Sequence, residues 1–172
     1  TRRAATNIER LARHTEKREQ FARLAVLACD ILRQLPDPDM ALNNWERFVQ
    51  ALPDPADHFT TLFSQPTRLD ILLAIFAGSQ FLADTLIRYP QFWEWVTVPE
   101  TLHRSRHLDT VLAELTSLAG AATSYETWLD DMRRFRRRDL LRIGTRDICL
   151  KIPLPQITAE LSALAEAAIR VS

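Results

Sequence analysis

The feature that most constrains the fold of this chain is a long stretch, residues 124–150, that no proline interrupts. Its large apolar residues fall on one arc of a helical wheel drawn at 100° per residue: Tyr125, Trp128, Leu129, Met132, Phe135, Leu140, Ile143 and Leu150. Thr123 and Glu126 form a T-x-x-E capping box at its start. At about 1.5 Å per residue such a helix runs roughly 40 Å. The stretch therefore predicts one helix as long as a whole domain.

Shorter helical segments, separated by prolines, fill the rest of the chain. Only 3 glycines stand against 9 prolines, and no segment alternates as a strand does. The sequence predicts an all-α, multi-helix bundle of about seven to nine helices. We expect one helical domain over 1–172. It has a leading helix in 1–35, whose polar first half is a solvated face or a loose end, short helices in 40–120, and the long helix plus a terminal helix in 124–172. Gly78 is predicted to C-cap one short helix and Ser79 to N-cap the next.

The charge balance argues against a dedicated nucleic-acid-binding protein. Basic and acidic residues number 22 each, so the formal net charge is zero, whereas binding to a polyanion draws on an excess of Lys and Arg. Only Lys17 and Lys151 are lysines, and the remaining basic residues are arginines. Arginine favours bidentate pairing with carboxylates or phosphates.

No motif for catalysis or for binding a cofactor or metal is recognisable. His103 and His107 share a helical spacing but lack an intervening glutamate, and Cys29 and Cys149 lie far apart. No apolar run reaches the length of a membrane span, and no signal-peptide pattern opens the chain. We expect a cytoplasmic protein without a membrane partner. The chain begins inside a helical pattern, and we expect it to be a fragment.

The candidate interaction or structural residues are mostly the charged residues of the long helix: Arg133, Arg134, Arg136, Arg137, Arg138, Asp139, Arg142 and Arg146, together with Gly78 and Ser79. On the wheel, Arg136, Asp139 and Arg146 fall on the apolar arc. Because a buried arginine must be paired, we expect Arg136 and Arg146 to form internal ion pairs. Arg134, Arg137 and Arg138 are expected to face outward.

Three interpretations of this arginine cluster remain open. The first is a structural ladder of ion pairs with a solvated outer face. The second is a docking face for another domain or protein. The third, against which the zero net charge argues, is a surface for nucleic acid, which a stand-alone helical binding module would present.

Three segments together resemble one family. They are FAGSQFLADTLIRYP at 76–90, RRFRRRDLLRIGTRDI at 133–148 and ITAELSALAEAA at 157–168. In this order they are similar to helical segments of the bifunctional glutamine synthetase adenylyltransferase/adenylyl-removing enzymes, and the resemblance covers residues 42–172. It is closer to the amino-terminal, adenylyl-removing half of that family.

The resemblance implies a nitrogen-regulating enzyme that transfers AMP from ATP to a tyrosine of glutamine synthetase and removes it by phosphorolysis. It implies ATP and magnesium for the longer enzyme, and glutamine synthetase and a PII-type signalling protein as partners. The chain stops before the Gly-rich loop and paired aspartates of a nucleotidyltransferase domain would appear. We therefore expect no catalytic residue and no cofactor in this fragment, and a role in packing on that domain.

Overall fold

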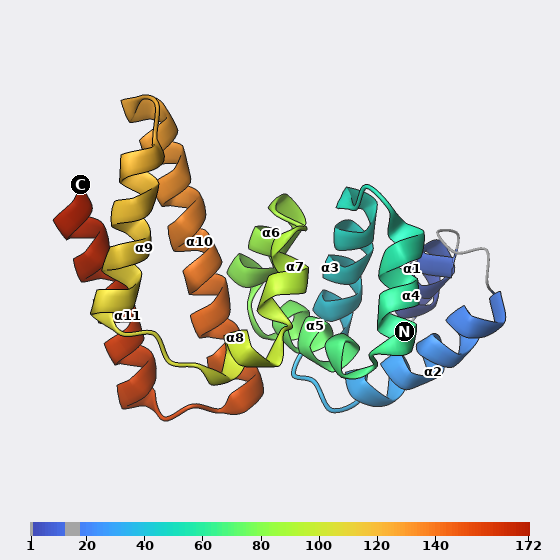
Figure 1. The fold of residues 1–172 in the computed structure, drawn as a ribbon. Coiled ribbons are helices and arrows are strands. Elements are labelled where there is room, and N and C mark those ends of the chain that lie inside the picture. The colour runs from blue at the N-terminus through green and yellow to red at the C-terminus, as the bar shows by residue number, and fades with distance from the viewer. Residues whose placement is uncertain (1, 13–17) are drawn as a thin grey trace. The chain divides into compact units, whose positions relative to one another are not determined.

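The computed structural model describes residues 2–12 and 18–172, and these residues form eleven α-helices and no strand (Figure 1). The predicted all-α fold is confirmed. The helices are α1 (Arg2–Ala12), α2 (Arg18–Leu32), α3 (Pro38–Ala51), α4 (Pro55–Ser64), α5 (Thr67–Gly78), α6 (Gln80–Arg88), α7 (Phe92–Val96), α8 (Pro99–His103), α9 (Leu108–Ala121), α10 (Tyr125–Leu150) and α11 (Leu154–Val171). Their number exceeds the predicted range, because the leading segment forms two helices and the chain adds the five-residue helix α8. Among the described residues, no helix is long and apolar enough to cross a membrane.

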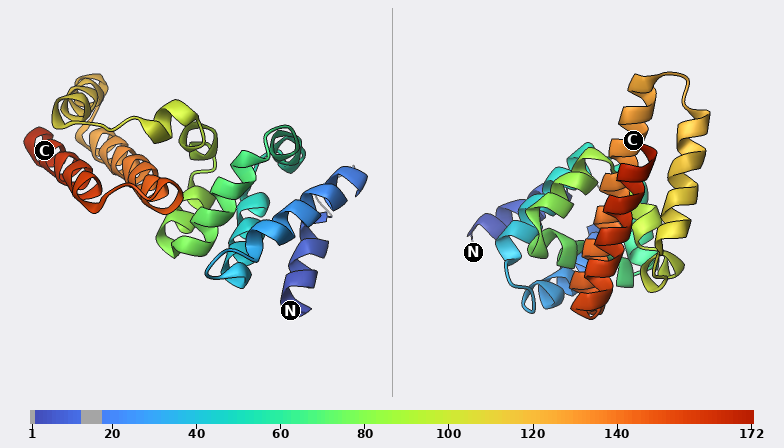
Figure 2. Two further views of the ribbon diagram at one scale, coloured as in Figure 1. Left: turned by 90° about the horizontal axis from the view of Figure 1, so that it is seen from below. Right: turned by 90° about the vertical axis from the view of Figure 1, so that its left-hand side faces the viewer.

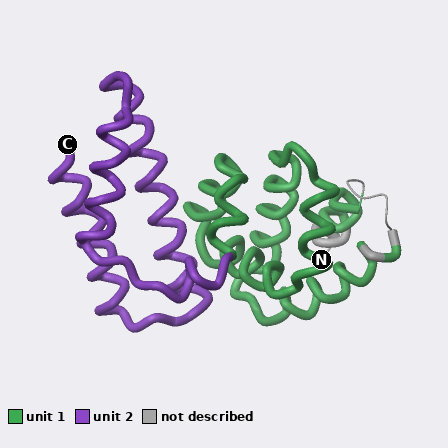
Figure 3. Tube along the Cα trace, viewed as in Figure 1, with its two compact units in different colours: residues 1–97 green, residues 98–172 purple. Residues whose placement is uncertain are grey.

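Contacts divide the chain into two compact units, residues Thr1–Thr97 and Val98–Ser172 (Figure 3). Unit 1 contains α1 to α7, and unit 2 contains α8 to α11. Each unit has its own set of packed helices, and the single domain over 1–172 stays a prediction.

The predicted leading helix is two helices, α1 and α2. Helix α1 packs on α3, and α2 packs on α4 and α5. Leu11 is fully buried, and the Asn7 side chain donates a hydrogen bond to the Asn43 side chain at 2.8 Å. Helix α1 thus has two sides: Asn7 and Leu11, four residues apart, share one inward face, whereas Glu9 and Arg10 are exposed, as expected of a solvated face.

Aromatic side chains form much of the core of unit 1. Helix α3 packs against α5, α1 and α6, and it brings Trp45 and Phe48 into the interior. The Phe48 ring lies 5.7 Å from Phe76 and 6.2 Å from Trp93, measured between ring centroids. The apolar sequence of α5 is buried almost all round, as expected for a central helix.

Gly78 and Ser79 form the junction between α5 and α6. Ser79 accepts a hydrogen bond from the Leu82 amide at 3.4 Å, so its predicted N-cap role is confirmed. Gly78 is the last residue of α5, and Ser79 is the C-cap. No described glycine has a positive φ, so the predicted glycine cap is wrong by one position.

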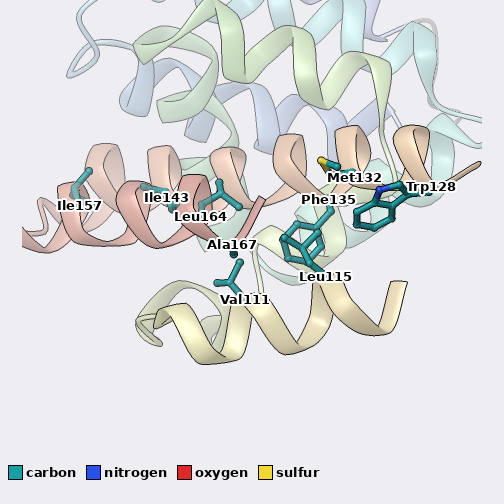
Figure 4. Packing of buried hydrophobic residues seen from close by; sticks show 9 residues of the cluster. All are labelled: Val111, Leu115, Trp128, Met132, Phe135, Ile143, Ile157, Leu164 and Ala167. Atoms are coloured by element: carbon teal, nitrogen blue, oxygen red, sulfur yellow. The ribbon is translucent and has the colours of Figure 1, made fainter. Parts of the chain in front are cut away.

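Unit 2 is built around α10, with α9 and α11 packed against it and against each other (Figure 2). The predicted long helix is confirmed from Tyr125 to Leu150. Its N-cap is Ser124, which accepts from the Thr127 amide at 3.1 Å, rather than Thr123. The helix ends at Leu150, and its C-cap Lys151 has a left-handed backbone with a φ of 49°. Nine buried residues from the three helices form the apolar core (Figure 4): Val111, Leu115, Trp128, Met132, Phe135, Ile143, Ile157, Leu164 and Ala167.

Candidate functional site

Helix α10 carries a row of buried charges on the face that bears its apolar core residues. Asp139, Arg142 and Arg146 lie three and four residues apart, so they share one side of the helix. Their exposed fractions are 1%, 1% and 2%. Charges that are this deeply buried persist only when they are paired and hydrogen-bonded. Their partners come from α8, from the segment between α8 and α9, and from α11.

Arg142 uses all parts of its guanidinium. Its Nε donates to Asp139 Oδ1 at 3.2 Å, and its Nη1 donates to the backbone carbonyl of Arg104 at 3.2 Å. Its Nη2 donates to Glu160 Oε2. One side chain of α10 thereby holds the segment after α8 and the helix α11 together.

Arg146 connects α10 to α8, to the segment after α8 and to α11. Its Nη1 donates to the carbonyl of Leu102, and its Nη2 donates to Ser105 Oγ at 3.2 Å. The same Nη2 lies 3.2 Å from Glu160 Oε1, an ion pair whose geometry is not that of a hydrogen bond. The predicted internal pairing of Arg146 is confirmed.

Arg106, from the segment between α8 and α9, links α9 to α10. It forms an ion pair with Glu114 and another with Asp139, the latter at 2.5 Å. Arg138 pairs with the other oxygen of Glu114 at 2.5 Å. Both guanidiniums lie near the Phe135 ring, 5.6 Å from its centroid for Arg106 and 5.0 Å for Arg138. This placement adds a cation–π contribution to the ion pairs.

These residues are called the arginine network below: Arg106, Arg138, Arg142, Arg146, Glu114, Asp139 and Glu160. Partial burial acts to raise the pKa of Glu114, but the hydrogen bonds and charges of Arg138 and Arg106 outweigh it and hold that pKa below its ordinary value. Glu114 is therefore ionised at neutral pH. Every carboxylate of the network contacts at least two arginines, so each one connects two basic side chains within unit 2.

The arginines at the start of the cluster lie outside this network. Arg133 pairs with Asp130 at 2.9 Å on the surface, Arg134 and Arg136 are exposed, and Arg137 is half-buried. The predicted internal pair of Arg136 is wrong, because this residue lies at the edge of the buried arc and its long side chain extends to water.

Arg138 and Arg142 also depart from the sequence analysis. The expectation that Arg138 faces outward is wrong, since it turns to Glu114 of α9. Arg142, for which the wheel gave no inward placement, is among the most deeply buried residues. The packing of α9 and α11 on two sides of α10 widens the buried arc beyond the one that apolar residues outline.

Three network residues were missed in the sequence: Arg106, Glu114 and Glu160. For Glu160 a signal was present, because it follows Ile157 by three residues and precedes Leu164 by four. An acidic residue at that spacing lies on the apolar face of its helix, and a buried carboxylate requires a cationic partner. Arg106 lies in the segment between α8 and α9, and its sequence context gives no such signal.

A pocket of about 440 Å³ opens beside the network, lined in part by Arg106, His107, Gln156 and Glu160. Arg106 and Glu160 already have partners inside the network. Across the described part of the chain, no three His, Cys, Asp or Glu side chains are grouped so as to hold a metal ion. The chemistry of the site is therefore that of a fixed set of ion pairs joining three helices and the 104–107 segment.

More than half of the chain matches one protein-family model. The family model of glutamate-ammonia ligase adenylyltransferase matches residues 69–172, which include the whole of unit 2 and the arginine network. The chain belongs to this family.

Curated relatives agree with this assignment. Proteins described as bifunctional glutamine synthetase adenylyltransferase/adenylyl-removing enzyme are similar to the chain: one from Streptomyces coelicolor is 31% identical over 99% of the chain, and one from Shewanella loihica is 32% identical over 76%. The chain spans only 18% and 13% of the length of these two relatives. No solved structure matches the chain significantly.

Proposed function

We propose that this chain is a non-catalytic helical part of an enzyme that adenylylates and de-adenylylates glutamine synthetase in nitrogen regulation. The observation that carries the proposal is the family match over residues 69–172. Catalysis would belong to a nucleotidyltransferase domain elsewhere in the enzyme, with ATP and magnesium. The helices would pack on that domain and help to present glutamine synthetase, in the cytoplasm, with a PII-type protein as regulator.

The arginine network supports a structural role for unit 2. Asp139, Arg142 and Arg146 are almost completely buried and engaged with protein partners. A set of directional bonds between α10, α11 and the 104–107 segment keeps their surfaces in one arrangement. A rigid support of this kind can hold a catalytic domain and a large protein substrate in register.

The alternative, a stand-alone module that binds protein or nucleic acid through its outer arginines, has less support. Arg138 and Arg142 are directed to Glu114 and Glu160 inside unit 2, which leaves a smaller basic surface than the sequence cluster indicates. The formal net charge of zero also provides no general attraction for a polyanion.

The test is transfer of labelled AMP from ATP to purified glutamine synthetase, with magnesium. We expect transfer by the full-length gene product and none by residues 1–172 alone. Transfer by the 172-residue chain would contradict the non-catalytic role. A full-length product that modifies other proteins but leaves glutamine synthetase unlabelled would contradict the proposed substrate.

A further inference from the structure

Helix α11 carries apolar residues on two of its faces, and one of these faces is exposed. The buried face packs on α9 and α10 and carries Ile157, Glu160, Leu164 and Ala167. The exposed face is called the outer stripe here: Leu154, Thr158, Leu161, Ala165 and Ile169. These residues are spaced by four, three, four and four positions, which places them along one side of the helix.

The outer stripe is unusual for a face in contact with water. Leu154 is 71% exposed, Leu161 39% and Ile169 77%. A surface helix of a globular protein ordinarily directs charged side chains outward, yet the stripe contains none. The nearby charges of Glu166 and Arg170 pair with each other. An uncharged strip about 22 Å long remains, at about 1.5 Å per residue.

We propose that the outer stripe of α11 is the seat of an amphipathic helix from the part of the enzyme outside these 172 residues. The inference rests on the proposed function, because it requires a longer polypeptide. The spacing of the stripe is that of a seam between two packed helices. Thr158 and Ala165 alternate with the larger Leu154, Leu161 and Ile169, so the side chains of a second helix can fit between them.

A second copy of the chain fits this surface less well. A stable interface between separate molecules buries about 800 Å² on each partner, and the three large side chains of the stripe supply only a fraction of that area. A helix of the same polypeptide requires less contact, because its linkage keeps it at a high effective concentration. The relatives have room for such a helix, since the chain spans 18% of the one from Streptomyces coelicolor. The family match continues through residue 172, so all of α11 belongs to it.

The experiment measures how fast a thiol on the stripe reacts with a water-soluble maleimide. Cys29 and Cys149 are replaced by serine and Leu161→Cys is introduced, both in residues 1–172 and in the full-length gene product. We expect the thiol at position 161 to react at least about tenfold more slowly in the full-length protein, because a covered side chain reacts only after local opening. Thr110→Cys, on an exposed position of α9, is the matched control and should react at similar rates in both proteins.

Three results would overturn the proposal. They are equal rates for Leu161→Cys in the two proteins, protection in the 172-residue chain that grows with its concentration, and a gene product that ends at Ser172. The labelling also separates this inference from the proposed function. Protection without AMP transfer to glutamine synthetase would leave the interface standing and refute the function, whereas AMP transfer without protection would do the reverse.

Discussion

The two units of this chain bury different kinds of side chain. In unit 1, the rings of Phe48, His58 and Trp93 meet at centroid distances of 5.3 to 6.2 Å. In unit 2, Arg142 and Asp139 are each 1% exposed and lie within the helical interior. One unit is held mainly by shape and dispersion, and the other adds ion pairs among buried charges.

The difference shows what each kind of core can specify. Apolar contacts depend little on direction, so an aromatic core sets the volume that the helices enclose more strongly than their exact register. The guanidinium of Arg142 has fixed donor directions, toward Asp139, Glu160 and a backbone carbonyl. These bonds therefore hold the helices of unit 2 and the 104–107 segment in one arrangement. Removal of one partner should lower the free energy of unfolding strongly.

The largest expected effect comes from breaking the network at its centre. Arg142→Ala leaves the carboxylates of Asp139 and Glu160 buried with fewer partners, which destabilises folding by about 3–5 kcal/mol. Chemical denaturation followed by circular dichroism measures this loss. The matched control is Arg136→Ala on the same helix, where an exposed arginine should change the free energy of unfolding by less than about 0.5 kcal/mol. Similar losses for the two variants would contradict a stabilising role of the arginine network.

A second substitution tests whether the cost in Arg142→Ala arises from stranded charge. Glu160→Gln, added to Arg142→Ala, removes one of the two carboxylates that the first change leaves underpaired. We expect the double variant to be more stable than the sum of the two single losses, as residues of one network are non-additive. Strict additivity would indicate that Arg142 contributes through packing alone.

Unit 1 offers the corresponding test without charge. Phe48 is fully buried, and Phe48→Ala should destabilise by about 3–5 kcal/mol through lost contacts and a cavity. Hydrogen exchange read by mass spectrometry should show faster exchange in α3 and α5 first. Unlike Arg142→Ala, this variant has no charged partner whose replacement restores stability. An exchange pattern that spreads equally through α10 and α11 would contradict independent cores.

A smaller effect should separate the units by pH. Burial lowers the pKa of His58 from 6.5 to about 3, so the imidazole is neutral when folded. The unfolded chain binds a proton below pH 6.5 and the folded chain does not until about pH 3. The stability that His58 contributes is therefore complete above pH 6.5 and declines as the pH falls, by about 2 kcal/mol at pH 5.

Glu114 of unit 2 affects stability in a lower pH range than His58 of unit 1. The pKa of Glu114 is held below its ordinary value of 4.5, so the stability that it contributes is present above that value and is lost only as the pH falls through its folded pKa. The free energy of unfolding should thus fall less between pH 7 and pH 5 in His58→Gln than in the wild type. The amide oxygen of the glutamine can still accept a hydrogen bond from Trp45 Nε1. His103→Gln, at an exposed position, is the control and should keep the wild-type slope. A wild-type slope in His58→Gln would contradict a buried neutral imidazole.

The sequence was sufficient for the class of fold and for the long helix, because both follow from local signals. Apolar spacing without interruption predicted α10, and the residues that end helices, proline above all, predicted most of the breaks. The contacts of the leading segment were not predicted, because Asn7 and Arg10 look like surface residues, and only the facing residues Asn43 and Glu46 of α3 show that they have partners. That information lies more than thirty positions along the chain.

The candidate site was predicted only in part, for a related reason. A helical wheel orders residues around one helix, and it placed Asp139 and Arg146 correctly. It could not place Arg136, Arg138 or Arg142, because their positions depend on where α9 and α11 pack. A long arginine at the edge of an arc can turn to water or to a neighbouring carboxylate, and tertiary packing selects between the two.

The smallest expected effect concerns the N-cap of α10, which the sequence predicted at Thr123 and which the structure places one residue later, at Ser124. Ser124 caps α10 by accepting from the Thr127 amide, while Thr123 lies one position earlier. Ser124→Ala should therefore destabilise unit 2 by about 1 kcal/mol, the usual value of a lost N-cap, and should speed exchange in the first turn of α10. Thr123→Ala is the matched control and should have almost no effect. A larger loss for Thr123→Ala than for Ser124→Ala would restore the T-x-x-E box and contradict the cap in the structure, because the two residues compete for the same free amides.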